Sequence, residues 1–217
     1  MKSRIQDYLL SLVFTVFIIS FCICFVIFFK PFYSLEVNLL HIDTMVDLSK
    51  STIIHNYSQL IDYQSFLYKG KLVLDNFSMS TTGRIHFEEV KRIFVYIQYA
   101  CIVSGIISVI GIYINTKKHE YRYLPLTSFF TITIPLVLGF LVSLNFDAAF
   151  IKMHQLLFNN DYWLFDPYTD PVINILPDTY FYHCFILIVV LIIVFAIIIY
   201  RIYKYKYNQI INGDEIE

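Results

Sequence analysis

Residues 145–181 read NFDAAFIKMHQLLFNNDYWLFDPYTDPVINILPDTYF and separate two long apolar runs without resembling either of them. The stretch holds one histidine, the only tryptophan of the chain and three prolines. A helix here would place the histidine on an otherwise apolar face at i, i+4, i+7 and i+8 spacing, formed by Phe150, His154, Leu157 and Phe158. Trp163 and the nearby tyrosines are residue types that settle at lipid headgroup level. The pattern predicts an interfacial helix that holds a titratable imidazole at the depth of acyl ester bonds.

The composition is that of a membrane protein. Of 217 residues, 58% are hydrophobic, 18% aromatic and 15% charged, and the mean hydropathy is +0.63, far more apolar than a soluble domain. The net charge of −1 and the scattered basic residues argue against a nucleic-acid partner. The four cysteines lie inside apolar runs, with neither metal-ligand nor redox spacing, at Cys22, Cys24, Cys101 and Cys184. We therefore expect no disulfide framework and no bound metal or cofactor.

Four apolar runs are each long enough to cross about 30 Å of hydrocarbon. They cover residues 8–29, 93–114, 124–144 and 180–200. No small-residue cleavage site follows the first run, so we interpret it as a retained span. The sequence thus predicts a single α-helical polytopic membrane domain with four transmembrane helices over residues 1–217.

A region of mixed composition, residues 30–92, separates the first two spans and predicts a folded cap. Within it, Ile54, Tyr57 and Ile61 repeat at helical spacing, whereas residues 70–77 alternate like a short strand. We expect a small extracellular α/β cap inserted between the first and second transmembrane helices.

Basic residues predict the orientation in the membrane. Lys2, Arg4, the loop 117–122 and the lysine-rich tail fall on one side, while the second long loop, residues 145–179, carries Lys152 against five aspartates. By the positive-inside rule both termini are cytoplasmic in a plasma membrane. The cap and the second loop then share the outer face.

His86 is the second candidate for a functional imidazole. The sequence Ser-Thr-Thr-Gly at residues 80–83 precedes it, and a threonine hydroxyl there is expected to cap a helix that runs through His86 into the second span. His86 and His154 are therefore predicted at the same outer-leaflet interface. Imidazole, with a pKa near 6.5, exchanges protons at neutral pH, and such assistance is worth about 10²–10⁴ in rate.

Templates for a covalent acyl-enzyme are missing from the sequence. There is no G-x-S-x-G elbow, no H-x₄-D pair and no H-E-x-x-H motif, and no cysteine is placed like an activated thiolate. The residues favour proton transfer by histidine over nucleophilic catalysis by the protein.

Two motifs carry a family resemblance. The run HQLLFNNDYWLFDPYTDPVINILP, residues 154–177, resembles the signature of the bacterial lipoprotein intramolecular transacylase family, four-span membrane proteins of Gram-positive bacteria. The run HFEEVK, residues 86–91, is similar to the upstream histidine motif of that family, with Glu89 where an aspartate is expected. The resemblance follows the order of spans over most of the chain.

The resemblance implies lipoprotein maturation by acyl transfer. Members move the sn-2 acyl chain of the diacylglyceryl moiety onto the α-amino group of the N-terminal cysteine, which gives lyso-form lipoprotein. The partners would be the lipidated N-terminus of a lipoprotein and membrane lipid, with no cofactor. We hypothesise that His86 and His154 are the catalytic acid and base, in either order.

Five further residues are candidates for a supporting role. Glu89 and Asp147 lie at helical spacing from the two histidines and are candidates to orient the imidazoles. Tyr162 and Trp163 are candidates to line an aromatic pocket, and Asp166 is first a turn former.

Other interpretations remain open from the residues alone. Each histidine could be an interfacial residue bonded to a backbone carbonyl, and each carboxylate a solvated surface group. The chain could then be a non-enzymatic membrane accessory or sensor protein, or another outer-leaflet acyl hydrolase or transferase. A channel or transporter is disfavoured because, apart from His183, the cysteines and the tyrosines, the four spans lack ionisable residues.

Overall fold

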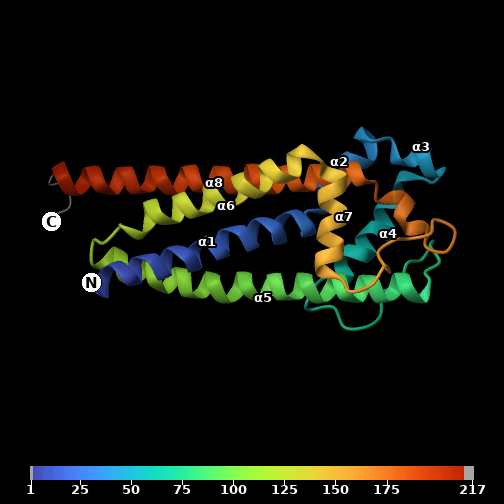
Figure 1. Ribbon diagram of the computed structural model, residues 1–217, viewed down its shortest axis with the longest axis horizontal. Helices are drawn as coiled ribbons and strands as arrows, with labels where there is room; N and C mark the ends of the chain where they lie inside the picture. The colour runs from blue at the N-terminus through green and yellow to red at the C-terminus, as the bar shows by residue number, and fades with distance from the viewer. Residues whose placement is uncertain (1, 213–217) are drawn as a thin grey trace. The chain divides into compact units, whose positions relative to one another are not determined.

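The computed structural model describes residues 2–212, and this part of the chain forms eight α-helices and one 3-10 helix with no strand (Figure 1). The helical part of the predicted fold class is therefore confirmed. The described chain divides into two compact units. The first comprises residues 2–23, 98–140 and 187–212, and the second comprises residues 24–97 and 141–186.

Four long helices contribute segments to both units: α1 (Lys2–Phe28), α5 (Thr81–Lys117), α6 (Tyr123–Leu144) and α8 (Asp178–Asn212). Within the described residues, three helical stretches are long and apolar enough to cross a membrane: Arg4–Phe28, Thr81–Lys117 and Asp178–Asn212. A shorter apolar stretch, Tyr123–Val137, belongs to α6.

The first unit packs these helices through hydroxyl groups and small residues as well as apolar side chains. Buried Ser11 donates a hydrogen bond to the carbonyl of Tyr123 at 3.0 Å, which joins α1 to α6. Ser128 donates to the carbonyl of Ala196 at 2.9 Å, which joins α6 to α8. Such interhelical hydrogen bonds are a common means of association between apolar helices.

The second unit contains the shorter elements, which are α2 (Lys30–Leu39), α3 (Ile42–Val46), α4 (Lys50–Tyr63), α7 (Phe146–Leu157) and the 3-10 helix η1 (Pro171–Ile175). Its core is apolar and aromatic. The rings of Tyr33 and Tyr57 stack with their centroids 3.6 Å apart, and the hydroxyl of Tyr33 donates to the carbonyl of Ile175 at 2.6 Å. This core ties α2 and α4 to η1, which follows the loop of the candidate site.

The strand predicted over residues 70–77 is wrong, because the segment has no regular secondary structure. The backbone amides of this segment donate hydrogen bonds to side chains of α4, rather than to a neighbouring strand. The Gln59 side chain accepts from the Asp75 amide at 3.1 Å, and the Asn56 side chain accepts from the Asn76 amide at 3.1 Å. The described part of the cap is therefore helical and irregular rather than α/β.

Periodicity in this region predicted burial better than it predicted backbone pairing. Leu72 and Leu74 are buried, whereas Val73 between them is exposed. An alternating pattern requires only an extended backbone over a core, and this can occur without a ladder of hydrogen bonds. The helix predicted from Ile54, Tyr57 and Ile61 is confirmed as α4.

Candidate active site

The N-terminal end of α5 positions His86, which lies in the second turn of this helix. Ser80 precedes the helix, and its hydroxyl accepts from the amide of Gly83 at 2.9 Å. The predicted hydroxyl cap is thus present, but serine rather than threonine provides it. The buried carboxylate of Asp170 accepts from the Ser80 amide at 2.7 Å, and a Cβ added at Gly83 would collide with that carboxylate. Close packing of the Asp170 loop on the start of α5 therefore requires glycine at this position.

The last turn of α7 positions His154. Asn145 caps the other end of this helix by accepting from the amide of Ala148 at 2.9 Å. The Nδ1 of His154 lies 2.8 Å from the carbonyl oxygen of Phe150. Because a carbonyl only accepts, Nδ1 carries the proton in the neutral ring, and Nε2 keeps an available lone pair.

The structure brings the two predicted histidines together within the second unit. Their ring centroids are 6.0 Å apart and the ring planes are inclined by 35°. Both side chains are buried, with 5% of His86 and 9% of His154 exposed. Each imidazole is thus close enough to contact one small group placed between them.

Aromatic rings enclose the pair. The ring of Phe158 lies 4.8 Å from that of His86, and the ring of Phe165 lies 5.4 Å from it, both edge-on. The ring of Trp163 lies 4.9 Å from that of His154. The enclosure removes water from the imidazoles and strengthens any electrostatic interaction made there.

His86 keeps unused hydrogen-bonding capacity. Its Nδ1 is buried and has no hydrogen-bond partner within residues 2–212. A buried polar atom without a partner costs about 1–3 kcal/mol, and such groups are uncommon in folded proteins. A polar group of a substrate would recover that energy.

Burial also affects the protonation of His154. Desolvation lowers the pKa of this imidazole below its usual value near 6.5, while the hydrogen bond to the Phe150 carbonyl and the carboxylate of Asp178 offset part of the effect. His154 is therefore mostly neutral at pH 7. A neutral ring with a free Nε2 is suited to accept a proton.

Glu89 contacts an amide rather than an imidazole. The side-chain nitrogen of Asn160 donates to both of its carboxylate oxygens, at 3.0 and 3.3 Å. The indole nitrogen of Trp163 donates to the carbonyl of Asn160 at 3.1 Å. Glu89 thus holds the loop that carries Trp163, so Glu89 affects the histidines only indirectly, through this loop.

The remaining predicted residues lie farther from the chemistry. Asp147 is exposed in the first turn of α7. The carboxylate of Asp166 accepts from the Tyr168 amide at 2.9 Å, which makes it a turn former, and Tyr162 is exposed. Leu157, predicted on the histidine face of α7, is 48% exposed, so the buried face is narrower than the spacing predicted.

Sequence reasoning missed Asn160 and Asp178 and underestimated Asp170. Asn160 and Asp178 act on residues of other turns or helices, so no local spacing identifies them. Asp170 precedes Pro171, which is a turn signal, but its carboxylate is 2% exposed and accepts from the Ser80 amide, 90 positions away in the sequence.

Comparisons with known proteins agree on one family. The family model for the lipoprotein intramolecular transacylase Lit matches residues 8–181. The structure of the membrane integral lipoprotein intramolecular transacylase Lit from Bacillus cereus is similar, with 37% identity and a TM-score of 0.92 over 95% of this chain and 96% of that one.

Two mutant structures of the same Bacillus cereus protein are also similar. One has a histidine-to-arginine mutation, with 36% identity and a TM-score of 0.88 over 97% of this chain and 94% of that chain. The other has a histidine-to-alanine mutation, with 36% identity and a TM-score of 0.87 over 95% and 94%. No curated protein sequence gives a match. The chain therefore belongs to the lipoprotein intramolecular transacylase family, which confirms the predicted family, acyltransferase class and membrane location.

Proposed function

We propose that this chain moves the sn-2 acyl chain of an S-diacylglyceryl cysteine onto the α-amino group of the same cysteine, with His86 and His154 as the acid–base pair. The observation that carries the proposal is the juxtaposition of two buried imidazoles, 6.0 Å apart, in one aromatic enclosure. The reaction needs a base for the amine and an acid for the departing glycerol oxygen. It needs no nucleophile from the protein.

The substrate supplies both reacting ends. Counting the acyl carbon, the ester oxygen, two glycerol carbons, the sulfur, Cβ, Cα and the nitrogen, attack by the amine closes an eight-membered ring. Holding such a flexible ring in a reactive geometry can contribute several kcal/mol to the barrier reduction. The aromatic walls formed by Phe158, Phe165 and Trp163 are suited to that confinement.

His154 is the candidate base. The α-amino group has a pKa of about 7.7–8.0, so it is mostly protonated at pH 7 and must lose a proton before it attacks. The free Nε2 of His154, in a ring held by the Phe150 carbonyl, can accept that proton.

His86 is then the candidate acid. Burial and the neighbouring His154 lower the pKa of His86 to about 4, so its ring is neutral at pH 7 and acts as an acid only by relaying a proton. As the C–O ester bond breaks, His86 accepts at one ring nitrogen the proton that His154 took from the amine, and the proton of its other ring nitrogen passes to the glycerol oxygen. One proton leaves the amine and one reaches the alcohol, so the reaction is an isomerisation without net consumption of water.

We further propose four membrane spans, about residues 8–29, 93–114, 124–144 and 180–200. Support for the third comes from the length of α6, because its 22 residues extend about 33 Å at 1.5 Å per residue, enough for a hydrocarbon core of about 30 Å.

The positive-inside rule supports cytoplasmic termini. Residues 30–92 then form the extracellular cap and residues 145–179 the second extracellular loop, whose α7 lies at the interface. In this topology both histidines lie at the outer leaflet, where diacylglyceryl lipoprotein is exposed.

The test is mass spectrometry of a lipoprotein N-terminal peptide from cells with and without this chain. Transfer leaves the intact mass unchanged, and fragment ions place one acyl group on the cysteine nitrogen. We expect this isomer only when the chain is expressed.

Two other outcomes would contradict the proposal. A loss of mass equal to one fatty acid would indicate a hydrolase. An unchanged peptide with a free amine, from cells in which the folded protein is detected in the membrane, would indicate an accessory or sensor protein.

A further inference from the structure

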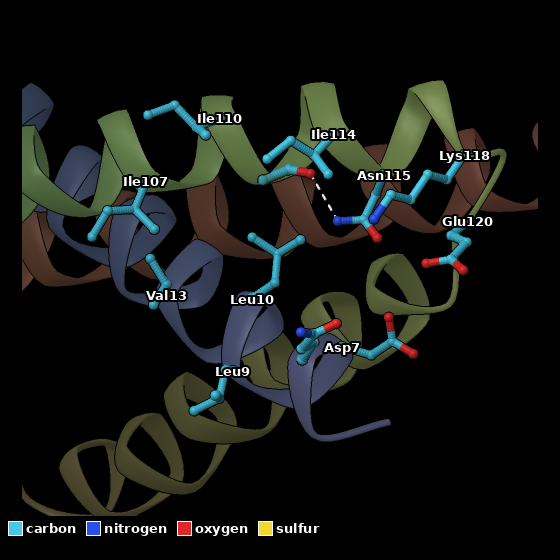
Figure 2. Close-up of a pocket in the computed structure, with 12 residues that line it drawn as sticks. Asp7, Leu9, Leu10, Val13, Ile107, Ile110, Ile114, Asn115, Lys118 and Glu120 are labelled. Atoms are coloured by element: carbon cyan, nitrogen blue, oxygen red, sulfur yellow. Dashed lines mark hydrogen bonds between the residues drawn. The ribbon is translucent and has the colours of Figure 1, made fainter. Parts of the chain in front are cut away.

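A cavity lies in the first unit, and the proposed acyl transfer does not use it. It has a volume of about 370 Å³ and lies along α1 and the C-terminal half of α5 (Figure 2). Its walls are apolar on both sides, formed by Leu9, Leu10, Val13, Ile107, Ile110 and Ile114. We call it the α1–α5 groove. The side chains of Leu9, Ile107, Ile110 and Ile114 are 44–58% exposed, so the groove opens to the surroundings of the helices.

The rim of the groove carries charges of both signs. Lys118 and Glu120, which follow the end of α5, both line it, together with Asp7 of α1 (Figure 2). The chain reverses at His119, whose φ is +53°, and the amide of Glu120 donates to the carbonyl of Asn115 at 2.9 Å. This turn holds a carboxylate and an ammonium group at the same rim.

These two rim charges differ from that of Asp7 in being unpaired. The carboxylate of Asp7 lies 3.3 Å from Nε of Arg122 and is already neutralised. Within residues 2–212, neither Lys118 nor Glu120 takes part in an ion pair. The rim therefore presents the ammonium group of Lys118 and the carboxylate of Glu120, both unpaired within the described chain, beside the apolar α1–α5 groove.

We propose that the α1–α5 groove binds one membrane aminophospholipid, a lipid whose head group carries a phosphate and a primary ammonium. An acyl chain would lie along the apolar walls, the phosphate would contact Lys118 and the ammonium would contact Glu120. The preference for an aminophospholipid over other lipids follows from charge complementarity with Lys118 and Glu120. A lipid with phosphate alone leaves Glu120 unpaired, and a quaternary ammonium cannot donate hydrogen bonds to it.

The expected consequence is stabilisation of the helices beside the groove. Gly111 packs against Leu10 so closely that an added Cβ would collide with its side chain, so α1 and α5 meet at the groove. A ligand that binds only the folded state raises its stability. Bound lipid should therefore raise the melting temperature of the purified protein.

The test uses the full chain in detergent with added phosphatidylethanolamine, phosphatidylglycerol or phosphatidylcholine. Native mass spectrometry counts retained lipids, and thermal unfolding measures stabilisation. We expect one phosphatidylethanolamine to be retained about fivefold more than either other lipid, since each exposed charge contact contributes 0.2–1 kcal/mol at most. Equal retention of the three lipids would overturn the proposal.

Substitutions at the rim sharpen the test. Glu120→Gln should reduce retention of phosphatidylethanolamine to that of phosphatidylglycerol, and Lys118→Gln should reduce retention of all three lipids. Lys117→Gln is the matched control, because Lys117 lies over the ring of Tyr113 and does not line the groove.

Melting temperatures without added lipid verify that each variant is folded. If folded Glu120→Gln and Lys118→Gln protein retains lipid as the Lys117→Gln control does, the assignment to the rim charges is wrong.

Discussion

The second unit holds two histidine arrangements: His183, which is partly exposed and pairs with a buried carboxylate, and the buried pair His86 and His154. They differ in which ring nitrogens have a partner in the protein. His183 has its Nδ1 2.7 Å from a carboxylate oxygen of Glu36, which is 3% exposed. His154 has its Nδ1 on a backbone carbonyl, and His86 has a buried Nδ1 without a partner within the described chain. A carboxylate partner satisfies a buried charge and joins α2 to α8. The pair of imidazoles instead leaves the Nδ1 of His86 without a partner within residues 2–212, so under the proposed function it is available to the substrate.

This difference predicts a stabilising role for His183 and a role in the reaction for His86 and His154. Removing one member of a buried carboxylate–histidine pair leaves the other unsatisfied, which reduces stability. Removing an imidazole whose nitrogens face a substrate reduces rate. Histidine substitutions in the two places should therefore separate stability from turnover.

The largest effect is expected at the imidazole pair. His154→Gln and His86→Gln should each lower the rate of N-acyl product formation by about 10²–10⁴. The double variant should be little worse than either single one, since groups that act as a unit lose their effect together. Rates per folded protein with a purified diacylglyceryl lipopeptide test this, and losses that multiply in the double variant would argue against a joint role.

The next largest effect is the response to pH. Because the pKa of His154 is lowered, the neutral base persists below pH 6.5 and is lost only as the pH falls through that lowered value. Below it, the rate should fall about tenfold per pH unit.

Asp178→Asn provides the control for this pH response. Removing the carboxylate that raises the pKa should move the acid limb to lower pH. A shift of the acid limb to higher pH in this variant, or an acid limb that begins above pH 6.5 in the parent protein, would contradict the assignment of His154 as base.

A smaller effect is expected from the enclosure. Trp163→Ala should lower the rate about tenfold, because an aromatic contact of this kind contributes 0.5–1.5 kcal/mol. Trp163→Phe keeps a ring beside His154 and should remain within about threefold of the parent rate. Equal losses in the two variants would show that the indole hydrogen bond to Asn160, rather than the ring contact, is what matters.

The smallest effect on turnover is expected at His183. His183→Ala should lower the free energy of unfolding by about 1–3 kcal/mol, because it leaves the buried Glu36 carboxylate unpaired. The rate per folded protein should stay near the parent value. Thermal unfolding and product analysis on the same sample separate the two quantities, and a hundredfold loss of rate without loss of stability would remove the distinction between the two arrangements.

Apolar length and residue chemistry were enough to predict the helical membrane class and to single out His86 and His154. Both signals are local, because a long apolar run and a histidine in an apolar face are visible within one segment. The strand over residues 70–77 was predicted wrongly because alternation reports burial, while strand formation needs a pairing partner elsewhere in the chain.

Pairings that join distant segments could not be predicted in this way. Glu36 and His183 are 147 positions apart, and Tyr57 and Tyr180, whose hydroxyls are hydrogen bonded, are 123 apart. No spacing rule relates such residues in a single sequence.

In the proposed reaction, both reacting groups belong to one substrate molecule held between His86 and His154. A crossover experiment tests it most directly. Two lipopeptides, one deuterated in its acyl chains and one isotopically labelled in its peptide, are mixed with the purified protein, and the N-acyl products are analysed by mass spectrometry. Intramolecular transfer predicts that each acyl label stays with its own peptide; a deuterated acyl chain on the labelled peptide would contradict the account.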